Sequence, residues 1–204
     1  MMKKIILGSA SPRRKEILAQ IGAEFTVRVS GKEEVYRSSR PEDIVRELAL
    51  MKAENVASDL SEELSEMKHT VIKDTVILGA DTVVVLDDRI LGKPGDKAEA
   101  FEMLTRLQGR THEVCTGVAA LDFDSTGRKR VTDHAVVTKV FVHTMTEKEI
   151  RDYIATGEPM DKAGAYGIQG RFAPYIDRIE GDYYNVVGLP ASYVYQMLKG
   201  LGAI

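Results

Sequence analysis

Residues 76–86 read VILGADTVVVL, an apolar and largely β-branched run that is typical of a buried strand. A single charged residue, Asp81, interrupts this run. A carboxylate held away from water has to be paired, protonated or bound to a cation, because burial disfavours its charged form. Asp81 is therefore either a structural hydrogen-bond anchor or the chemical centre of an active site, and Gly79 beside it would let backbone or ligand approach closely.

Shorter strands and amphipathic helices are expected on both sides of this run. The patterns predict strands at residues 5–7, 25–29, 75–86, 114–123, 135–143 and 175–187, and a hairpin partner of the central strand that ends at Gly92. They predict helices at residues 12–22, 41–58, 96–107, 146–155 and 190–200, with Ser11 and Thr146 as caps. Residues 59–73 are charged and predict a surface helix-turn or a loop. The order indicates a mixed α/β protein without strict βαβ alternation.

The composition excludes several classes of protein. A chain of 204 residues with 44% hydrophobic content suits a single domain over residues 1–204. A net charge of −3 argues against a nucleic-acid partner bound through bulk electrostatics. The one cysteine, Cys115, is expected to be buried and allows no intramolecular disulfide, so a reducing compartment fits. No apolar run reaches the length of a signal peptide or a membrane span, which predicts a cytoplasmic protein without a membrane partner.

The first candidate site is the segment SASPRR at residues 9–14, where a strand meets a helix. The helix dipole opposes the adjacent arginines Arg13 and Arg14 in the first turn, so they are either solvated or neutralised by a bound anion. In the second case free N–H groups, the hydroxyl of Ser9 and a guanidinium would converge on a polyphosphate. A Walker lysine loop and a GxGxxG fingerprint are both missing from the sequence, which argues against P-loop and Rossmann binding.

Further charged residues are candidates for the same chemistry. Glu33 and Glu34 follow the second strand and are either solvated or turned toward Asp81, where one could help to hold a divalent cation. Lys52 lies at the edge of the apolar stripe of its helix, so it either extends to solvent or contacts phosphate. Lys93, between a glycine and a proline, follows the hairpin and could return to the same end of the sheet.

A glycine-rich loop at residues 158–170 reads EPMDKAGAYGIQG. Its glycines at positions 164, 167 and 170 recur every third residue. This spacing serves either turns and tight packing, or the approach of the backbone to a planar base whose edge the Gln169 amide would read. The four histidines show no spacing typical of metal ligands: residues 69, 112, 134 and 143.

Five segments in this order resemble the Maf family of nucleotide pyrophosphatases: residues 9–14, 79–82 (GADT), 92–94 (GKP), 158–170 and 181–190 (GDYYNVVGLP). The likeness spans the chain from residue 3 to about residue 200. It implies an α/β fold like that of the inosine triphosphate pyrophosphatases, with a mixed elongated sheet flanked by helices and two lobes around a central cleft. It also implies that the protein forms a homodimer.

The resemblance further implies metal-assisted hydrolysis of a nucleoside triphosphate to the monophosphate and pyrophosphate, with Mg²⁺ or Mn²⁺ as cofactor. Asp81 matches the aspartate assigned as proton acceptor, and residues 161–170 look like the branch that prefers dTTP and UTP. Positions linked to substrate choice are matched by Arg13, Thr82 and Gln169. Other polar positions of the family pattern are matched by Ser9, Arg14, Glu34, Lys52 and Lys93.

These residues suggest a division of roles. Asp81 and Glu34 would bind the metal and position or deprotonate water, and Arg13, Lys52 and Lys93 would neutralise phosphates. Three alternatives stay open: a phosphohydrolase that releases orthophosphate, a nucleotide-binding regulator of cell division or septum formation with little turnover, and a purely structural protein.

Overall fold

The computed structural model describes residues 2–66 and 71–204, which divide into two compact units. The first unit comprises Met1–Asp81, Thr116–Ala135 and Gly188–Ile204, and the second comprises Thr82–Cys115 and Val136–Val187. Three strands contribute residues to both units: β3 (Thr75–Leu86), β5 (Thr111–Phe123) and β6 (Lys129–Val142). The sheet order over the described residues is β2-β1-β3-β5-β6-β7, with β4 paired to β3.

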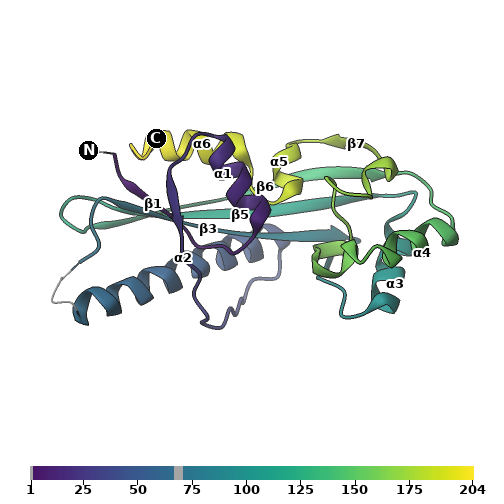
Figure 1. Cartoon of the computed structure of the whole chain (residues 1–204), viewed down its shortest axis with the longest axis horizontal. Helices are drawn as coiled ribbons and strands as arrows, with labels where there is room; N and C mark the ends of the chain where they lie inside the picture. Colours follow the sequence, from purple (N-terminus) through teal and green to yellow (C-terminus); the bar gives the residue numbers. More distant parts are fainter. Residues whose placement is uncertain (1, 67–70) are drawn as a thin grey trace. The chain divides into compact units, whose positions relative to one another are not determined.

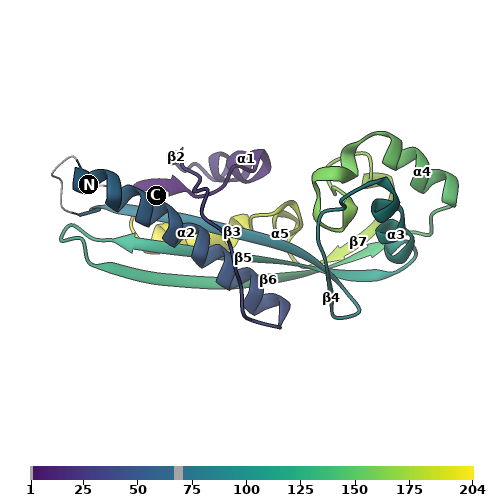
Figure 2. The same cartoon turned by 90° about the horizontal axis from the view of Figure 1, so that it is seen from below.

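In the first unit, β1 (Lys4–Leu7) runs parallel to both β2 (Phe25–Val27) and β3. The described residues of this unit form the helices α1 (Pro12–Gln20), α2 (Pro41–Glu66) and α6 (Ala191–Gly200). The helices α2 and α6 lie on opposite faces of the strands (Figures 1 and 2). Because both faces are covered, the strand segment Thr75–Ala80 is buried along its whole length.

The backbone of α2 comes very close to the sheet at two glycines. A Cβ added at Gly79 would overlap the carbonyl oxygen of Ala49, and one added at Gly117 would overlap that of Val45. Further along the helix, α2 packs on β3 and β5 in a buried cluster that includes Ala53, Val56 and Ala57. Glycine is the residue that allows this distance, so the sequence sets how near α2 lies to the strand that carries Asp81.

In the second unit, β4 (Arg89–Leu91) pairs antiparallel with β3, and β7 (Ile176–Glu180) pairs antiparallel with β6. The hairpin turn has Asp87 and Asp88 at φ 52° and 58°, the left-handed conformation that two-residue hairpins use. Three α-helices belong to this unit: α3 (Lys97–Leu107), α4 (Glu147–Ala155) and α5 (Tyr183–Val187). The 3₁₀ turns are η1 (Glu158–Asp161), η2 (Ala163–Ala165) and η3 (Ala173–Tyr175). Leu104, Tyr153 and Phe172 are among its core residues.

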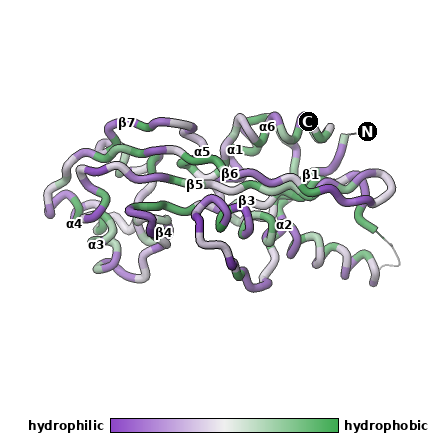
Figure 3. Tube along the Cα trace, turned by 180° about the vertical axis from the view of Figure 1, so that it is seen from behind, coloured by the Kyte–Doolittle hydropathy of each residue, from purple (hydrophilic) through white to green (hydrophobic). Residues whose placement is uncertain are grey.

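Most predicted elements are confirmed, but the long helix was predicted too short. The helix α2 continues past Ser58 to Glu66 because Leu60 and Leu64 extend its apolar stripe onto the cluster beneath it. Lys32 pairs with both Asp59 and Glu62 and ties this extension to the loop before the helix. In Figure 3 the tube of α2 changes between green and purple along its turns, as expected for an amphipathic helix. Residues 67–70 of the predicted charged segment, including His69, lie outside the described residues.

The strand predicted over residues 175–187 is wrong in its second half. The strand β7 ends at Glu180, and residues Tyr183–Val187 form the helix α5. Gly181 has a φ of 131°, which ends the strand, and the carboxylate of Asp182 accepts a hydrogen bond from the N–H of Tyr184 at 2.8 Å. The amide of the buried Asn185 donates to the carbonyl of Val114 at 2.9 Å, so a long-range contact holds this turn. The strands β5 and β6 also start earlier than predicted, at Thr111 and Lys129.

The mixed α/β class, with a sheet flanked by helices, is confirmed. The sheet combines parallel pairs at β1 with antiparallel pairs at β4 and β7. Over the two described stretches, no helix combines the length and the apolar character that crossing a membrane requires. The single domain over residues 1–204 and the central cleft stay predictions.

Candidate active site

The carboxylate of Asp81 is paired with a lysine. Lys52 Nζ donates to Asp81 Oδ1 at 2.7 Å and to Glu34 Oε2 at 2.6 Å, so one ammonium bridges two carboxylates. The side chains of Lys52 and Asp81 are 18% and 20% exposed, and that of Glu34 is 37% exposed. The group carries one net negative charge and is open to solvent on the Glu34 side. Asp81 is thus an ion-paired residue that a ligand can still reach.

Each member of this group is positioned by a different element. Asp81 sits on β3, and Lys52 lies on α2, which the contact at Gly79 holds against that strand. Glu34 belongs to the loop between β2 and α2. The carboxylate of Glu47 on α2 accepts hydrogen bonds from the N–H groups of Arg37 and Ser38 at 3.1 Å. A hydrogen bond from the side chain of Ser38, together with these N–H groups, lowers the pKa of Glu47. The loop is therefore anchored to the helix that carries Lys52.

Arg14 is a second cation of the first unit, and its guanidinium is engaged with the protein. Its Nε donates to the carbonyl of Gly188 at 2.8 Å, and its Nη1 donates to the carbonyl of Ala80 at 2.8 Å and to Ser9 Oγ at 3.1 Å. Burial lowers the pKa of Arg14, and the nearby Asp81 acts in the opposite direction. Arg14 thereby connects residues 9–14 and 181–190 to the residue that precedes Asp81. Its predicted contact with substrate stays a prediction.

The start of α1 has the polar character that the sequence predicts. Ser11 caps the helix and its side chain accepts from the N–H of Arg14, while Pro12 occupies the first turn. The hydroxyl oxygen of the buried Ser9 accepts from the N–H of Ser11 at 3.3 Å. The side chain of Arg13 makes no hydrogen bond or ion pair with another residue of the described stretches. A helix start with a guanidinium beside it is a place where an anion can bind.

The remaining predicted residues, Thr82, Lys93 and Gln169, belong to the second unit. Within this unit the exposed Lys93 turn is joined to the glycine-rich loop, because the N–H of Gly164 donates to the carbonyl of Gly92 at 3.0 Å. Gln169 is exposed at the corner of a turn closed by a hydrogen bond from the N–H of Gly170 to the carbonyl of Gly167, at 3.1 Å.

The glycines of the loop have distinct roles in packing. Gly164 has a φ of 66° and faces Val84, and a Cβ at Gly167 would press on the side chain of Lys162. A Cβ at Gly170 would overlap the carboxylate of Glu158. The regular spacing thus serves tight packing, which is the first of the two interpretations made from the sequence. The second, a contact of the loop with a base, stays a prediction.

Sequence reasoning missed the partners that hold these segments. The side chains of Glu47, Tyr153 and Glu158 bind backbone N–H groups of the loops that carry Glu34 and Gln169. Glu158 is the first residue of the fourth family segment, so the sequence singles it out. The sequence does not show which groups its side chain binds. Tyr153 lies outside all five segments and could be found only from the structure.

The donors present fit a divalent cation that arrives with a polyphosphate. In residues 2–66 and 71–204, no group of three or more His, Cys, Asp or Glu side chains could hold a metal ion. Mg²⁺ usually takes one or two protein carboxylates and completes its octahedron with phosphate oxygens and water. Asp81 and Glu34 would supply the two carboxylates, which lie near each other because both contact the ammonium of Lys52.

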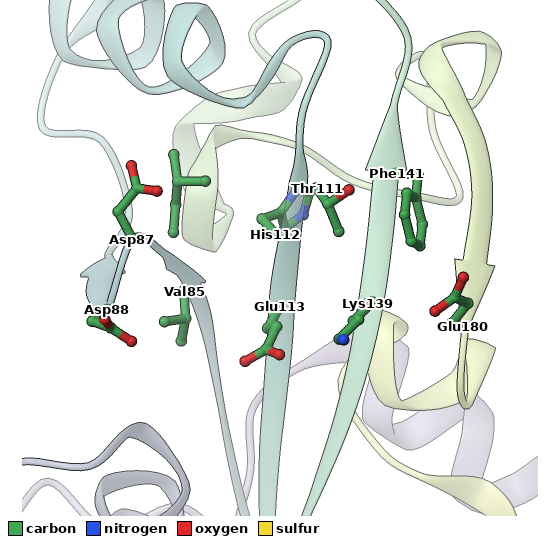
Figure 4. Close-up of a pocket in the computed structure, with 10 residues that line it drawn as sticks. Val85, Asp87, Asp88, Thr111, His112, Glu113, Lys139, Phe141 and Glu180 are labelled. Carbon is green, nitrogen blue, oxygen red and sulfur yellow. The ribbon is translucent and has the colours of Figure 1, made fainter.

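The second unit has a concavity of about 400 Å³ of its own. Figure 4 shows Glu113, Lys139 and Glu180 on three neighbouring strands along its wall, with His112 behind Thr111. None of the predicted site residues lines it. His112 is buried, and its Nε2 lies 2.7 Å from the hydroxyl of Tyr166. Burial lowers the pKa of His112 to about 4, so the imidazole is neutral near pH 7.

Several known proteins are similar to this chain over nearly its whole length. The dTTP/UTP pyrophosphatase of Lachnoclostridium phytofermentans is 47% identical over 201 residues, which are 98% of this chain and 96% of that protein. The dTTP/UTP pyrophosphatase of Agathobacter rectalis is 49% identical, covering 98% of both chains. Among solved structures, the Staphylococcus aureus Ham1 protein is 12% identical with a TM-score of 0.47, over 97% of this chain and 99% of that one.

The family assignment follows from the extent of the match. A family model described as Maf-like protein matches residues 4–201, which is nearly the whole chain. The matched range contains every predicted site residue, and the relatives' identity extends over the same length. The chain therefore belongs to the Maf family.

Proposed function

We propose that this protein hydrolyses nucleoside triphosphates, with dTTP and UTP as preferred substrates, to the monophosphate and pyrophosphate. The observation that carries the proposal is the group of Glu34, Lys52 and Asp81, which lies in a chain 47–49% identical to relatives named dTTP/UTP pyrophosphatase. Modified pyrimidine nucleotides have the same phosphate chemistry and belong to the substrate class.

The reaction asks little covalent chemistry of the protein. A water oxygen forms a bond to the α-phosphorus, the bond from that phosphorus to the bridging oxygen breaks, and pyrophosphate leaves. Asp81 orients this water and accepts its proton, since its carboxylate is held by Lys52 yet partly open to solvent. Mg²⁺ or Mn²⁺, held by Asp81 and Glu34, would neutralise phosphate charge when bound.

Phosphate binding falls to the cations of the site. Arg13 at the start of α1 contributes a guanidinium, and Lys52 and Lys93 contribute ammonium groups. Ser9 and Arg14 are assigned to the same phosphate-binding region, and Arg14 Nη1 donates a hydrogen bond to Ser9 Oγ. Thr82 and Gln169 are proposed to hydrogen-bond the pyrimidine, because a polar pocket rejects a mismatched base by leaving donors and acceptors unpaired, at about 1–3 kcal/mol each. The homodimer and the cytoplasmic location belong to this proposal as well.

Product analysis tests the reaction class. Purified protein is incubated with Mg²⁺ and a panel of UTP, dTTP, CTP, GTP and modified pyrimidine triphosphates, and the released pyrophosphate and orthophosphate are measured separately. We expect pyrophosphate in equal amount to the monophosphate, fastest from UTP and dTTP. Release of orthophosphate would support the phosphohydrolase alternative, and nucleotide binding without turnover would support the regulator.

Asp81→Asn tests the catalytic residue. The change removes the charge and the proton acceptor but keeps the shape, so we expect turnover to fall by about 10²–10⁴-fold while folding and triphosphate binding persist. Asp152→Asn, on the exposed face of α4, serves as the matched control. Turnover of Asp81→Asn within about tenfold of the wild type would contradict the assignment.

A further inference from the structure

The turn that carries Gln169 is held at both ends by two side chains of the second unit. The hydroxyl of Tyr153 accepts a hydrogen bond from the N–H of Gly167 at 3.2 Å, before Gln169. Glu158 Oε2 accepts one from the N–H of Arg171 at 3.0 Å, after Gln169. The two side chains are joined, since Tyr153 donates to Glu158 Oε1 at 2.9 Å. A single tyrosine–glutamate pair therefore fixes the backbone on both sides of the turn.

The clamp formed by Tyr153 and Glu158 rests on a rigid base. Tyr153 is a buried residue of α4, packed against Phe172 with ring centroids 5.1 Å apart. Burial raises the pKa of Tyr153, so its hydroxyl stays protonated and donates to the carboxylate. Glu158 starts η1 immediately after the left-handed Gly157, and Lys162 Nζ donates to its carbonyl at 2.9 Å. Both members are thus held independently of the turn.

The loop sequence is matched to this clamp. A Cβ at Gly170 would overlap the Glu158 carboxylate, so only glycine leaves room for the carboxylate at that point. Gln169 itself is exposed and makes no hydrogen bond within residues 2–66 and 71–204. Two side chains and a glycine therefore fix the backbone around Gln169, although the side-chain amide of Gln169 faces solvent. A structural turn gains little from such a restraint, whereas a recognition residue gains precision from it.

We propose that Glu158 and Tyr153 are positioning residues for base recognition, which act by fixing the turn that presents the Gln169 amide to the pyrimidine. This inference rests on the proposed function and deepens it, because it assigns part of the substrate choice to residues that do not touch the substrate. Losing the restraint lets the turn sample other conformations, and the bound geometry is then only one of several.

The test compares Glu158→Ala, Tyr153→Phe and Gln169→Ala with the wild type, using kcat and KM for UTP and CTP. Glu102→Ala, on the exposed face of α3, is the matched control. We expect both clamp variants to lower the preference for UTP over CTP in kcat/KM by about tenfold, roughly the effect of one lost hydrogen bond. The loss should appear mainly as a higher KM for UTP, because base contacts act on ground state and transition state alike.

A double variant and an exchange measurement separate positioning from general damage. Gly170→Ala should resemble Glu158→Ala, because the new methyl displaces the carboxylate, and the combined variant should lose no more than either alone. Amide hydrogen exchange at Gly167 and Arg171, followed by NMR, should quicken by about tenfold or more in the clamp variants. If Glu158→Ala does not fold, Tyr153→Phe, which removes one oxygen, decides the question.

The outcomes distinguish this inference from the proposed function. A wild type that releases no pyrophosphate overturns the proposed function and the inference with it. An active wild type in which Gln169→Ala lowers the UTP preference while both clamp variants keep it overturns the inference alone. Amide exchange rates at Gly167 and Arg171 that stay unchanged in the clamp variants would also overturn the inference alone.

Discussion

Asp81 is a charged residue in an apolar strand, and an ion pair offsets the unfavourable burial of its carboxylate. In an apolar strand its carboxylate would be expensive, and the ammonium of Lys52 compensates that charge at 2.7 Å. The same ammonium contacts Glu34, so it holds two acids in place in the absence of ligand. In the proposed function this lysine would also be the cation that contacts the phosphates of the substrate. One residue therefore serves both the stability of the strand and the proposed chemistry.

Lys52→Ala should separate these two roles. Without the ammonium, Glu34 and Asp81 lose the cation that pairs with both of them, and the proposed phosphate contact is lost. We expect kcat/KM for UTP to fall by about 100-fold, equivalent to about 2.7 kcal/mol, with a smaller loss for Lys52→Arg. Lys199→Ala, at the exposed end of α6, is the control. A decrease of less than about threefold would remove Lys52 from the mechanism.

His112 should make the protein sensitive to mild acid. Its pKa is lowered by burial to about 4, whereas in the unfolded chain it lies near 6.5. Between these values the unfolded state binds more protons, so the free energy of unfolding falls as the pH falls. From pH 7 to pH 5 the wild type should lose about 2 kcal/mol more than His112→Gln. Urea unfolding across this range measures the difference, and parallel pH curves for the two proteins would contradict it.

Two glycines of the sheet let α2 pack closely against it. Gly79 of β3 and Gly117 of β5 leave space for the helix backbone at Ala49 and Val45. The helix carries Lys52, so this contact sets the distance between Lys52 and Asp81. The helix also carries Glu47, so the contact sets where the loop that contains Glu34 is anchored. A packing detail in the core thus reaches the candidate site.

Gly117→Ala should show the cost of filling that space. The added methyl overlaps the carbonyl oxygen of Val45, so helix and strand must separate, and we expect a loss of about 3 kcal/mol in the free energy of unfolding. Gly200→Ala, which meets nothing within 4 Å, should change stability by less than about 1 kcal/mol. Chemical denaturation of both variants provides the comparison. Equal stabilities would show that α2 can move at little cost.

The two units share their strands but differ in what they contribute. The first unit contains Asp81, Glu34, Lys52 and the arginines of α1, which is the set suited to phosphates and a cation. The second unit contains Lys93 and the clamped turn of Gln169. Within each unit, the strands bring together groups that lie far apart in the sequence.

Removing the metal should stop the reaction without unfolding the protein. Excess EDTA is expected to abolish turnover, and added Mg²⁺ or Mn²⁺ should restore it. The thermal midpoint should change by less than about 2 °C, because the ammonium of Lys52 already pairs with both Glu34 and Asp81. Differential scanning calorimetry and the pyrophosphate assay measure the two effects. Full activity in EDTA would exclude a metal role, and a large drop in the midpoint would indicate a structural ion.

The sequence alone determined the elements whose signals are local. The buried strand with Asp81, the Ser11 and Thr146 caps, the Asp87–Asp88 hairpin turn and the mixed α/β class all follow from periodicity, capping and turn chemistry within a few residues. The family segments then identified the candidate residues, because their order along the chain is itself sequence information.

Only the tertiary structure decided which of these residues meet. The ion pairs of Lys52 with Asp81 and Glu34 join residues 29 and 18 positions apart, and Arg14 reaches Gly188 across 174 positions. Other long-range contacts hold residues 183–187 as a helix and extend α2 to Glu66: the hydrogen bond from Asn185 to Val114, and the packing of Leu60 and Leu64 on the buried cluster. Such pairings depend on how the elements pack, and the local pattern of side chains does not contain that information. Asp81 was recognisable from its strand, but its partner was not.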